Sequence, residues 1–359
     1  MAAPSYDAAA TDTPVGPLRS AFGELPVSAI AAWSAFAAPA LADAPLNYMH
    51  GDGAKAYPVV GLTWLVLIIA AGVVVVIGIL LAIAVFRRRN ITPLLLDEKM
   101  PLSHPVATSW ITIGVAISSV LLLIALVWTA VVFADISNPP RKTAFTIEIT
   151  GHQWWWQVRY MGHSSDTILS TANEIHIPTG VPVKLELKTA DVIHSFWIPA
   201  LSGKMDTIPN QTNTTWIEAD KPGIYYGQCT EYCGVEHAKM RMLMVAQPPA
   251  EFQQWWRHSL QPATPPKADD ARQGMISFVV HCGSCHTVAG TDAMGVLGPD
   301  LSHLASRKMI AAGTIPNTPA YLSGWIADPQ AMKPGNLMPK LELTGPELAN
   351  IRTYLETLK

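Results

Sequence analysis

The chain has 359 residues, a length that suits about two or three domains. Half of its residues are hydrophobic, only 14% are charged and the mean hydropathy is +0.24, so it is more apolar than soluble proteins of this size. A net charge of −3, without a basic block interleaved with aromatic residues, excludes the nucleic-acid-binding proteins. The composition therefore favours a membrane protein with no nucleic-acid partner.

Residues 1–45 are predicted to form a leader that contains a signal peptide. An apolar, alanine-rich stretch ends at Ala40-Leu41-Ala42, a small-x-small pattern typical of a cleavage site. Because Arg19 is the single basic residue ahead of it, an alanine-rich leader without a signal is the alternative.

Residues 46–138 are predicted to form a transmembrane hairpin. The stretches 62–86 and 110–133 contain no charged residue, and each exceeds the roughly 20 residues that a helix needs to cross a bilayer. A buried core helix is the less favoured interpretation of each stretch. Three arginines at 87–89 open the connecting loop, so the positive-inside rule places this loop in the cytoplasm. We therefore expect two spans in a bacterial inner membrane, with both termini on the periplasmic side.

Residues 139–258 show the period of two that is typical of strands with one buried face. Apolar and polar residues alternate in FTIEI (145–149) and VPVKLELKT (181–189), and Pro or Gly clusters separate such runs. An amphipathic stretch at 250–256 follows. The pattern predicts a small β-sandwich or barrel, and the polar, Pro-rich segment 259–270 predicts a linker.

Residues 271–359 show helical patterns at 319–326 and 346–358, which predict a compact α domain. The motif HCGSCH in this domain holds Cys282, Cys285 and His286 in the C-x-x-C-H pattern, which attaches a c-type haem through two thioethers and one axial imidazole. A zinc site or a dithiol redox pair is less favoured, because a zinc site would require a second Cys pair nearby.

A methionine is the usual second axial ligand of such a haem, and it raises the reduction potential. The downstream candidates are Met294, Met309, Met332 and Met338. Met338 in KPGNLMPK is favoured, because Pro and Gly hold an extended loop that can aim a thioether sideways. Met332 is the alternative, and core filling is the commoner role of any single methionine.

The remaining cysteines lie in CTEYCGVEHAKM, which combines Cys229, Cys233, His237 and Met240 within twelve residues. Sulfur and imidazole ligands select copper, and copper centres of the blue type are built on β-sandwich loops. A mononuclear blue centre uses one cysteine, whereas two thiolates can bridge a pair of coppers. A copper pair needs a second imidazole, for which His194 is the best candidate. A Cys229–Cys233 disulfide is the alternative in an oxidising compartment.

Several stretches resemble subunit II of the haem–copper cytochrome c oxidases. They are GHQWWWQVRY (151–160), DVIHSFWIPAL (191–201), KMDTIPN (204–210), PGIYYGQC (222–229) and the C-x-E-x-C-x-x-x-H-x-x-M motif. With its haem domain, the chain resembles the haem-c-fused subunit II of caa3-type oxidases from about residue 46 to its end. The resemblance implies a multidomain membrane protein with a two-helix transmembrane hairpin, a cupredoxin-like β-sandwich with a dinuclear copper site, and an all-α class I cytochrome c domain.

The resemblance also implies the roles of individual residues. The dinuclear CuA centre would take His194, Cys229, Cys233, His237, Met240 and the backbone carbonyl of Glu231 as ligands. The carboxylate of Glu231 would face a magnesium ion shared with subunit I. Trp154 matches the position where electrons enter beside CuA, although packing under the copper loops is an equally good interpretation.

The implied function is an electron relay in an oxidoreductase and translocase. A cytochrome c or another periplasmic or membrane donor would reduce the haem, and electrons would pass to CuA and then to the haem a of subunit I. Subunit I would reduce oxygen and pump protons, and subunit III would be a further partner; this chain is expected to hold no oxygen-reducing site. The alternatives are a CuA-bearing subunit of a nitric oxide reductase or other terminal reductase, and a membrane-tethered copper-binding assembly protein.

The chain departs from the family at the start of its second span. The family often has a glutamate at the mouth of a proton path there, where this chain has Ala107. His104 or Glu98 would be the substitute. Asp191 and Asp206 resemble positions that dock soluble cytochrome c, and with a fused haem domain their partner would be that domain.

Overall fold

The computed structural model describes residues 46–87, 105–162 and 168–359, without the side chains of 105–107. The predicted signal peptide, most of the arginine-led loop, Glu98, His104 and the Ala107 side chain lie outside the described residues. These described residues belong to one compact unit that comprises a helical hairpin, a β-sandwich and a second helical region.

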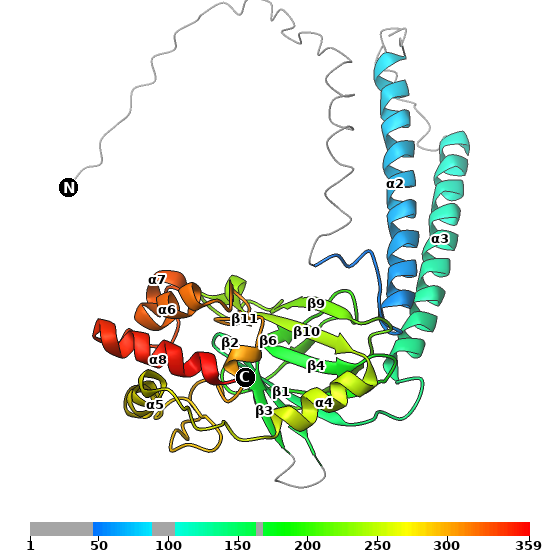
Figure 1. Ribbon diagram of the computed structural model, residues 1–359. Helices are drawn as coiled ribbons and strands as arrows, with labels where there is room; N and C mark the ends of the chain where they lie inside the picture. The colour runs from blue at the N-terminus through cyan, green and yellow to red at the C-terminus, as the bar shows by residue number, and fades with distance from the viewer. Residues whose placement is uncertain (1–45, 88–104, 163–167) are drawn as a thin grey trace, which may run out of the picture. The chain divides into compact units, whose positions relative to one another are not determined.

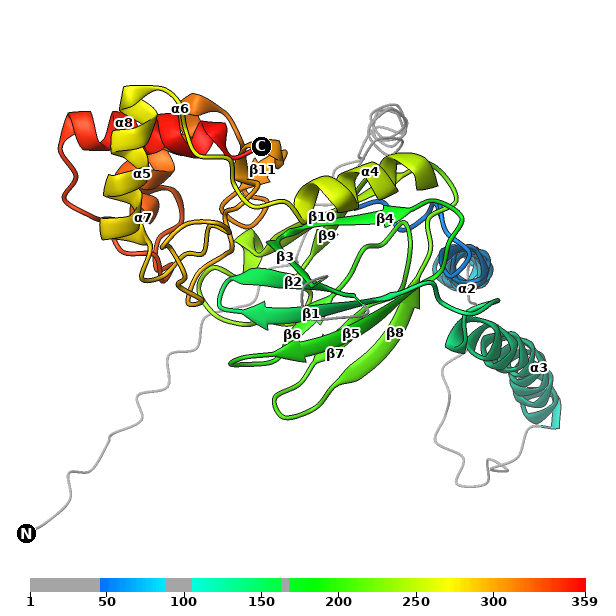
Figure 2. The same cartoon turned by 60° about the horizontal axis from the view of Figure 1, so that its bottom comes forward.

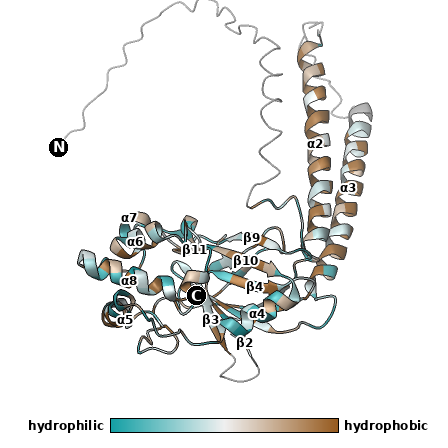
Figure 3. Ribbon diagram, in the orientation of Figure 1, coloured by the Kyte–Doolittle hydropathy of each residue, from teal (hydrophilic) through white to brown (hydrophobic). Residues whose placement is uncertain are grey.

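The hairpin consists of α2 (Ala56–Phe86) and α3 (Pro105–Ser137), which pack side by side (Figure 1). Both helices are long and apolar enough to cross a membrane (Figure 3), and their apolar side chains are mostly exposed. Such a large apolar surface needs lipid or protein to cover it. The prediction of two apolar helices at the N-terminal side of the sandwich is confirmed.

The larger sheet of the sandwich has the strand order β3-β2-β1-β5-β8. Its strands are β1 (Thr146–His152), β2 (Trp155–Met161), β3 (Leu169–Ala172), β5 (Val183–Thr189) and β8 (Asn213–Ile217). β1 pairs antiparallel with β2 and parallel with β5, with Ile147 opposite Tyr160 and Leu185. The alternation predicted at 145–149 and 181–189 therefore forms two neighbouring central strands.

The second sheet has the order β4-β10-β9, and β6 and β7 form a separate pair in which β7 contacts β5 and β8 of the larger sheet. Its strands are β4 (Glu174–Pro178), β9 (Gly223–Gln228) and β10 (Arg241–Gln247), while the short pair is β6 (His194–Phe196) and β7 (Met205–Thr207). The core lies between the sheets, and helix α4 (Pro249–Ser259) lies along β4 and β10 (Figure 2). The amphipathic pattern at 250–256 thus forms a helix whose Phe252 enters this core.

The C-terminal region is mainly helical. Its helices are α5 (Asp269–Cys282), α6 (Pro319–Ala327), α7 (Pro329–Met332) and α8 (Gly345–Thr357), with α5 packed on α8. It also has a hairpin of β11 (Met309–Ile310) and β12 (Ile315–Pro316), which the sequence did not predict, because two-residue strands are too short to show alternation. The linker packs on this domain, since Ala263 N donates to Ala289 O at 2.9 Å.

Candidate copper and haem sites

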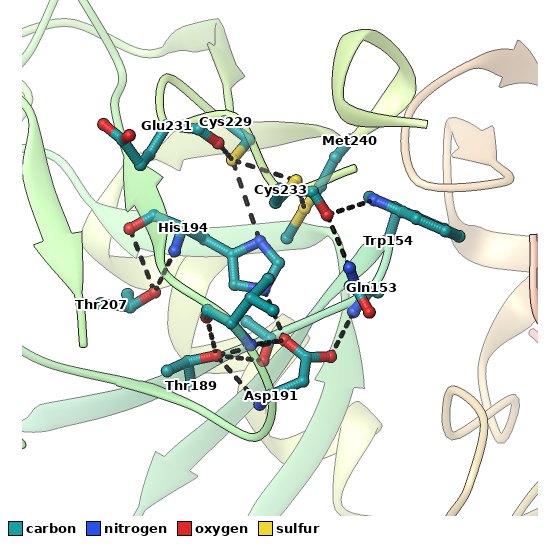
Figure 4. A network of polar contacts seen from close by, with 12 residues as sticks. Gln153, Trp154, Thr189, Asp191, His194, Thr207, Cys229, Glu231, Cys233 and Met240 are labelled. Carbon is teal, nitrogen blue, oxygen red and sulfur yellow. Dashed lines mark hydrogen bonds and ion pairs between the residues drawn. The ribbon is translucent and has the colours of Figure 1, made fainter. Parts of the chain in front are cut away.

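The loop between β9 and β10 brings the predicted copper ligands together (Figure 4). It contains the short 3-10 helix η2 (His237–Lys239). The loop is closed by the hydrogen bond from Cys229 N to Met240 O (3.0 Å), and it is joined to β6 by the bond from Thr230 N to Ser195 O (3.1 Å). Because His194 begins β6, these bonds carry the distant histidine to the loop.

The sulfur and nitrogen atoms of the five predicted side chains converge. Cys229 Sγ lies 3.9 Å from Cys233 Sγ and 4.0 Å from His194 Nδ1, and Cys233 Sγ lies 3.6 Å from His237 Nδ1. Met240 Sδ is 3.8 Å from Cys233 Sγ, and the carbonyl of Glu231 is 3.3 Å from Cys229 Sγ. His194, Cys229 and Cys233 form a buried group with metal-binding spacing. Both cysteines are free thiols, so the structure does not adopt the disulfide alternative.

The two thiols interact strongly with each other. The hydrogen bond from Cys233 stabilises the thiolate of Cys229 and lowers the pKa of Cys229, with a further contribution from His194. The same interaction raises the pKa of Cys233. Of the two thiols, Cys229 therefore loses its proton more readily. The proton of Cys233 would be displaced by a bound metal ion.

Asp191 orients His194 from outside the cluster. Nε2 of His194 donates to Asp191 Oδ1 at 2.7 Å, which leaves Nδ1 facing Cys229. Although burial opposes it, hydrogen bonding to Asp191 and Cys229 raises the pKa of His194. Gly151 leaves the space for the ring, because a Cβ there would lie 2.7 Å from His194 Cδ2. The sequence suggested Asp191 as a docking residue, but it did not indicate the contact of Asp191 with His194.

Glu231 and Trp154 lie on different sides of the loop. The Glu231 carbonyl faces Cys229, while its carboxylate points away from the cluster and is exposed (Figure 4). Trp154 is 9% exposed, and its indole Nε1 donates to the carbonyl of Cys233 at 3.0 Å. Gly234 has φ +120°, and a Cβ there would lie 2.8 Å from Trp154 Cζ2, so glycine allows this close contact. Gln153 donates to the same carbonyl at 2.6 Å, a contact that no sequence pattern indicated.

The residues of the C-x-x-C-H motif line a cavity of about 450 Å³. Cys282 ends α5, and Cys285 and His286 follow in the next turn. Nδ1 of His286 donates to the Pro299 carbonyl at 2.8 Å, which leaves Nε2 as the nitrogen with a free lone pair. A Cβ at Gly298 would lie 2.6 Å from His286 Cε1, so only glycine lets the ring sit here.

The structure separates the candidate methionines. Met338 and Met309 line the cavity, whereas Met332 does not. The Met332 methyl group lies against Gly324 instead, and Met294 is 77% exposed away from the cavity lining. The backbone of Met338 is held by the bond from its N–H to Asn336 Oδ1 (2.9 Å).

The cavity fits a haem. Its walls are mainly apolar, as a planar hydrophobic macrocycle requires; they include Phe278, Leu301, Leu304, Leu322, Trp325, Ile326 and Leu355. Two thiols and one imidazole at the same wall match covalent attachment and axial ligation. Trp154 and Trp155 of the sandwich also line the cavity. Because Trp154 contacts Cys233, the cavity reaches the residues that pack against the β9–β10 loop, residues 229–240, which is called the copper loop below.

Two protein families match the chain in separate regions. Residues 145–247 match the family "Cytochrome C oxidase subunit II, periplasmic domain", and residues 271–359 match the family "Cytochrome c". Cytochrome c oxidase subunit 2 of Alkalihalophilus pseudofirmus is 36% identical over 255 residues, which cover 70% of this chain and 72% of that protein. Cytochrome c oxidase subunit 2 of Bacillus sp. (strain PS3) is 31% identical over 291 residues, which cover 76% and 80%.

A solved structure is similar to the sandwich. It is the periplasmic domain of subunit II of cytochrome oxidase from Bradyrhizobium japonicum, with 32% identity over 33% of this chain and 95% of that one, and a TM-score of 0.31. The β-sandwich is cupredoxin-like. Its family implies copper, and the family of the cytochrome c domain implies haem. With its two apolar helices and its fused cytochrome c domain, this chain belongs to the cytochrome c oxidase subunit II family, whose members are membrane-anchored subunits of a haem–copper oxidase, an oxidoreductase.

Proposed function

We propose that this chain is the electron-accepting subunit of a caa3-type cytochrome c oxidase. It accepts electrons at a covalently bound haem c and delivers them through a dinuclear CuA centre to the haem a of subunit I, which reduces oxygen and pumps protons. One observation carries the proposal: Trp154 lines the haem cavity and also donates a hydrogen bond to Cys233 in the copper loop.

The copper ligands of the proposal are His194, Cys229, Cys233, His237, Met240 and the carbonyl of Glu231. Cys229 and Cys233 would hold the two copper ions, and the centre would supply one-electron transfer with little structural change on reduction. The protein's own contribution is to hold the ligands in place. The bond from His194 to Asp191 and the two bonds to the Cys233 carbonyl support this role, because they restrict the ligand side chains and the loop.

The haem ligands of the proposal are Cys282 and Cys285 for covalent attachment, and His286 and Met338 as axial ligands. Axial ligation by His and Met gives a c-type haem a raised potential that suits electron transfer. The fixed tautomer of His286 and the position of Met338 on the cavity wall support this assignment. Met332 is disfavoured, because its methyl group is packed against Gly324.

The partners of the proposal follow from the exposed groups and from the hairpin. Subunit I would lie at the exposed Glu231 carboxylate and share a magnesium ion with it, and subunit III would complete the complex. A periplasmic or membrane cytochrome would be the donor. The two spans with an arginine-led loop support an inner-membrane topology with both termini on the periplasmic side.

The test is the metal content and electron paramagnetic resonance (EPR) spectrum of the full chain, matured where haem c is attached and copper is supplied. We expect two coppers per covalent haem and a multiline signal from one electron shared by both coppers. The matched control is Cys229→Ala, which should keep the haem and lose that signal. One copper, or zinc, in a haem-loaded wild-type chain would contradict the CuA assignment.

A second measurement tests the route itself. Met240→Leu should retain copper and slow electron transfer from CuA to the next haem in flash-initiated kinetics. Kinetics equal to those of the wild type would remove Met240 from the proposed role.

A further inference from the structure

The cytochrome c domain contacts the copper loop on both sides of Met240. Arg241 N donates to Ala312 O at 3.0 Å, and Thr314 Oγ1 donates to Lys239 O at 3.1 Å. These two bonds flank the predicted copper ligand directly in the chain. The β11–β12 turn of the cytochrome c domain is therefore joined to the segment that carries Met240.

That turn has an unusual backbone. Ala311, Ala312 and Gly313 are consecutive residues with φ of 51°, 57° and 68°, and alanine rarely adopts this left-handed conformation. A Cβ at Gly313 would lie 3.1 Å from Arg241 Cβ, so the turn packs closely on the start of β10. The contact with the sandwich thus favours a conformation that the turn's own residues do not prefer.

Lys333 makes the second contact between the domains. The residue is 3% exposed, and its Nζ donates to the carbonyl of Trp154 at 2.8 Å. Next to it, Lys239 of the copper loop donates to the carbonyl of Met332 at 3.2 Å and lies 3.4 Å from Glu236. Burying an ammonium group is costly unless it is paired, and an apolar side chain of equal length could fill the same volume. The polar contact at Trp154 therefore calls for a role other than packing.

The position of Lys333 suggests that role. Lys333 lines the haem cavity, in the same loop as Met338, and its bond ends on the residue whose indole contacts Cys233. The Lys333 side chain thus connects the wall of the haem cavity to Trp154, which lies between this cavity and the copper loop. A change in the length or charge of the Lys333 side chain should therefore alter the distance between the haem and copper sites without altering a ligand of either site.

We propose that Lys333 is a positioning residue for electron transfer between the two cofactor sites, and that Lys333 and Thr314 together hold the cytochrome c domain in one fixed position on the copper loop. This inference rests on the proposed function. The transfer would move one electron, which would leave the reduced haem and reduce the copper centre. Transfer then occurs at a fixed distance and does not wait for the domains to meet.

The test is Lys333→Met in the full chain loaded with haem and copper. Flash-initiated transfer from haem to copper should slow by roughly tenfold or more and become dependent on solvent viscosity, because small misplacements of reacting groups cost one to two orders of magnitude. Pulsed EPR should show a broader haem–copper distance distribution, and redox titration of both sites should show that the loss of rate exceeds what the change in driving force accounts for. The matched control is Lys340→Met, since Lys340 is on the same loop, largely exposed and paired with Asp328.

Wild-type kinetics with a wild-type distance distribution in Lys333→Met would overturn the inference. If that variant fails to load either cofactor, Thr314→Val tests the other half of the contact, and a wild-type rate and distribution there would overturn it equally. If the wild-type chain binds both cofactors but shows no transfer between them, the proposed function fails and the inference fails with it. Transfer in the wild type with no effect of either variant removes the inference alone.

Discussion

The copper loop and the haem cavity place their ligands in opposite ways. In the copper loop each of the proposed ligand atoms of His194, Cys229, Cys233 and His237 lies within about 4 Å of another one, and hydrogen bonds with Asp191, Gln153 and Trp154 hold them there. In the cytochrome c domain, Met338 and the Cys282–His286 motif lie on the walls of a cavity of about 450 Å³. A small ion needs only converging side chains, whereas a macrocycle has to occupy part of the hydrophobic core.

The largest expected effect is a difference in stability between cysteine variants of the haem cavity and of the copper loop. Cys282→Ala with Cys285→Ala removes covalent attachment, so the apolar cavity loses the group that fills it. We expect the thermal midpoint of the cytochrome c domain to fall by roughly 15 °C or more, because about 1 kcal/mol shifts a domain of this size by 4–8 °C. Calorimetry of the full chain measures the fall. Cys229→Ala with Cys233→Ala should abolish copper binding but leave the circular dichroism of the sandwich intact, since its core lies between two complete sheets.

The comparison would break if the two double variants behaved alike. An equal loss of stability in both would mean that the copper cluster organises the sandwich as the haem organises its domain.

An intermediate effect concerns the axial methionine. Met338→Ala should keep the covalent haem and lower its reduction potential by roughly 100 mV or more, because axial ligands set haem potentials over a range of about 0.8 V. Met332→Ala is the matched control, since the Met332 side chain is outside the cavity lining. The haem of this variant should have the reduction potential of the wild type. Redox titration monitored by absorption measures both. The reverse result would assign the ligand to Met332.

A further effect is the pH dependence of stability contributed by the buried lysine. Burial lowers the pKa of Lys333 to about 8, below the value of about 10.4 for a lysine in an unfolded chain. Between these values the folded protein binds fewer protons than the unfolded chain, so stability should rise with pH across this window, by about 3 kcal/mol at most. The thermal midpoint of the wild type minus that of Lys333→Met should therefore increase from pH 8 to pH 10. A constant difference would mean that the ammonium is not buried in solution.

Much of the fold and of both sites followed from local patterns. The apolar stretches at 62–86 and 110–133 predicted the helices α2 and α3, and the alternation at 181–189 predicted β5. Residues four apart in one loop have to lie close together, so Cys229, Cys233 and His237 could be grouped without a structure. His194 was the best candidate for the second imidazole, but the spacing could not group it with the loop, because 35 residues separate it from Cys229.

The contacts between elements could not be read in the same way. Nothing in the sequence around Asp191 indicates that its carboxylate faces His194, and nothing around Lys333 indicates that its ammonium group reaches Trp154, 179 residues away. The choice of Met338 over Met332 as a cavity-lining residue also depends on how α6 and α7 pack.

The sequence by itself determined the two apolar helices, the β-sandwich, the thiol and imidazole motifs and the family, because periodicity and spacing act over a few residues and short motifs hold their ligand types together. Only the tertiary structure decided which methionine lines the haem cavity, which carboxylate orients His194 and where the cytochrome c domain touches the copper loop. These features depend on side chains that meet after distant segments have packed, and the packing free energy is spread over the whole core and not over any one motif.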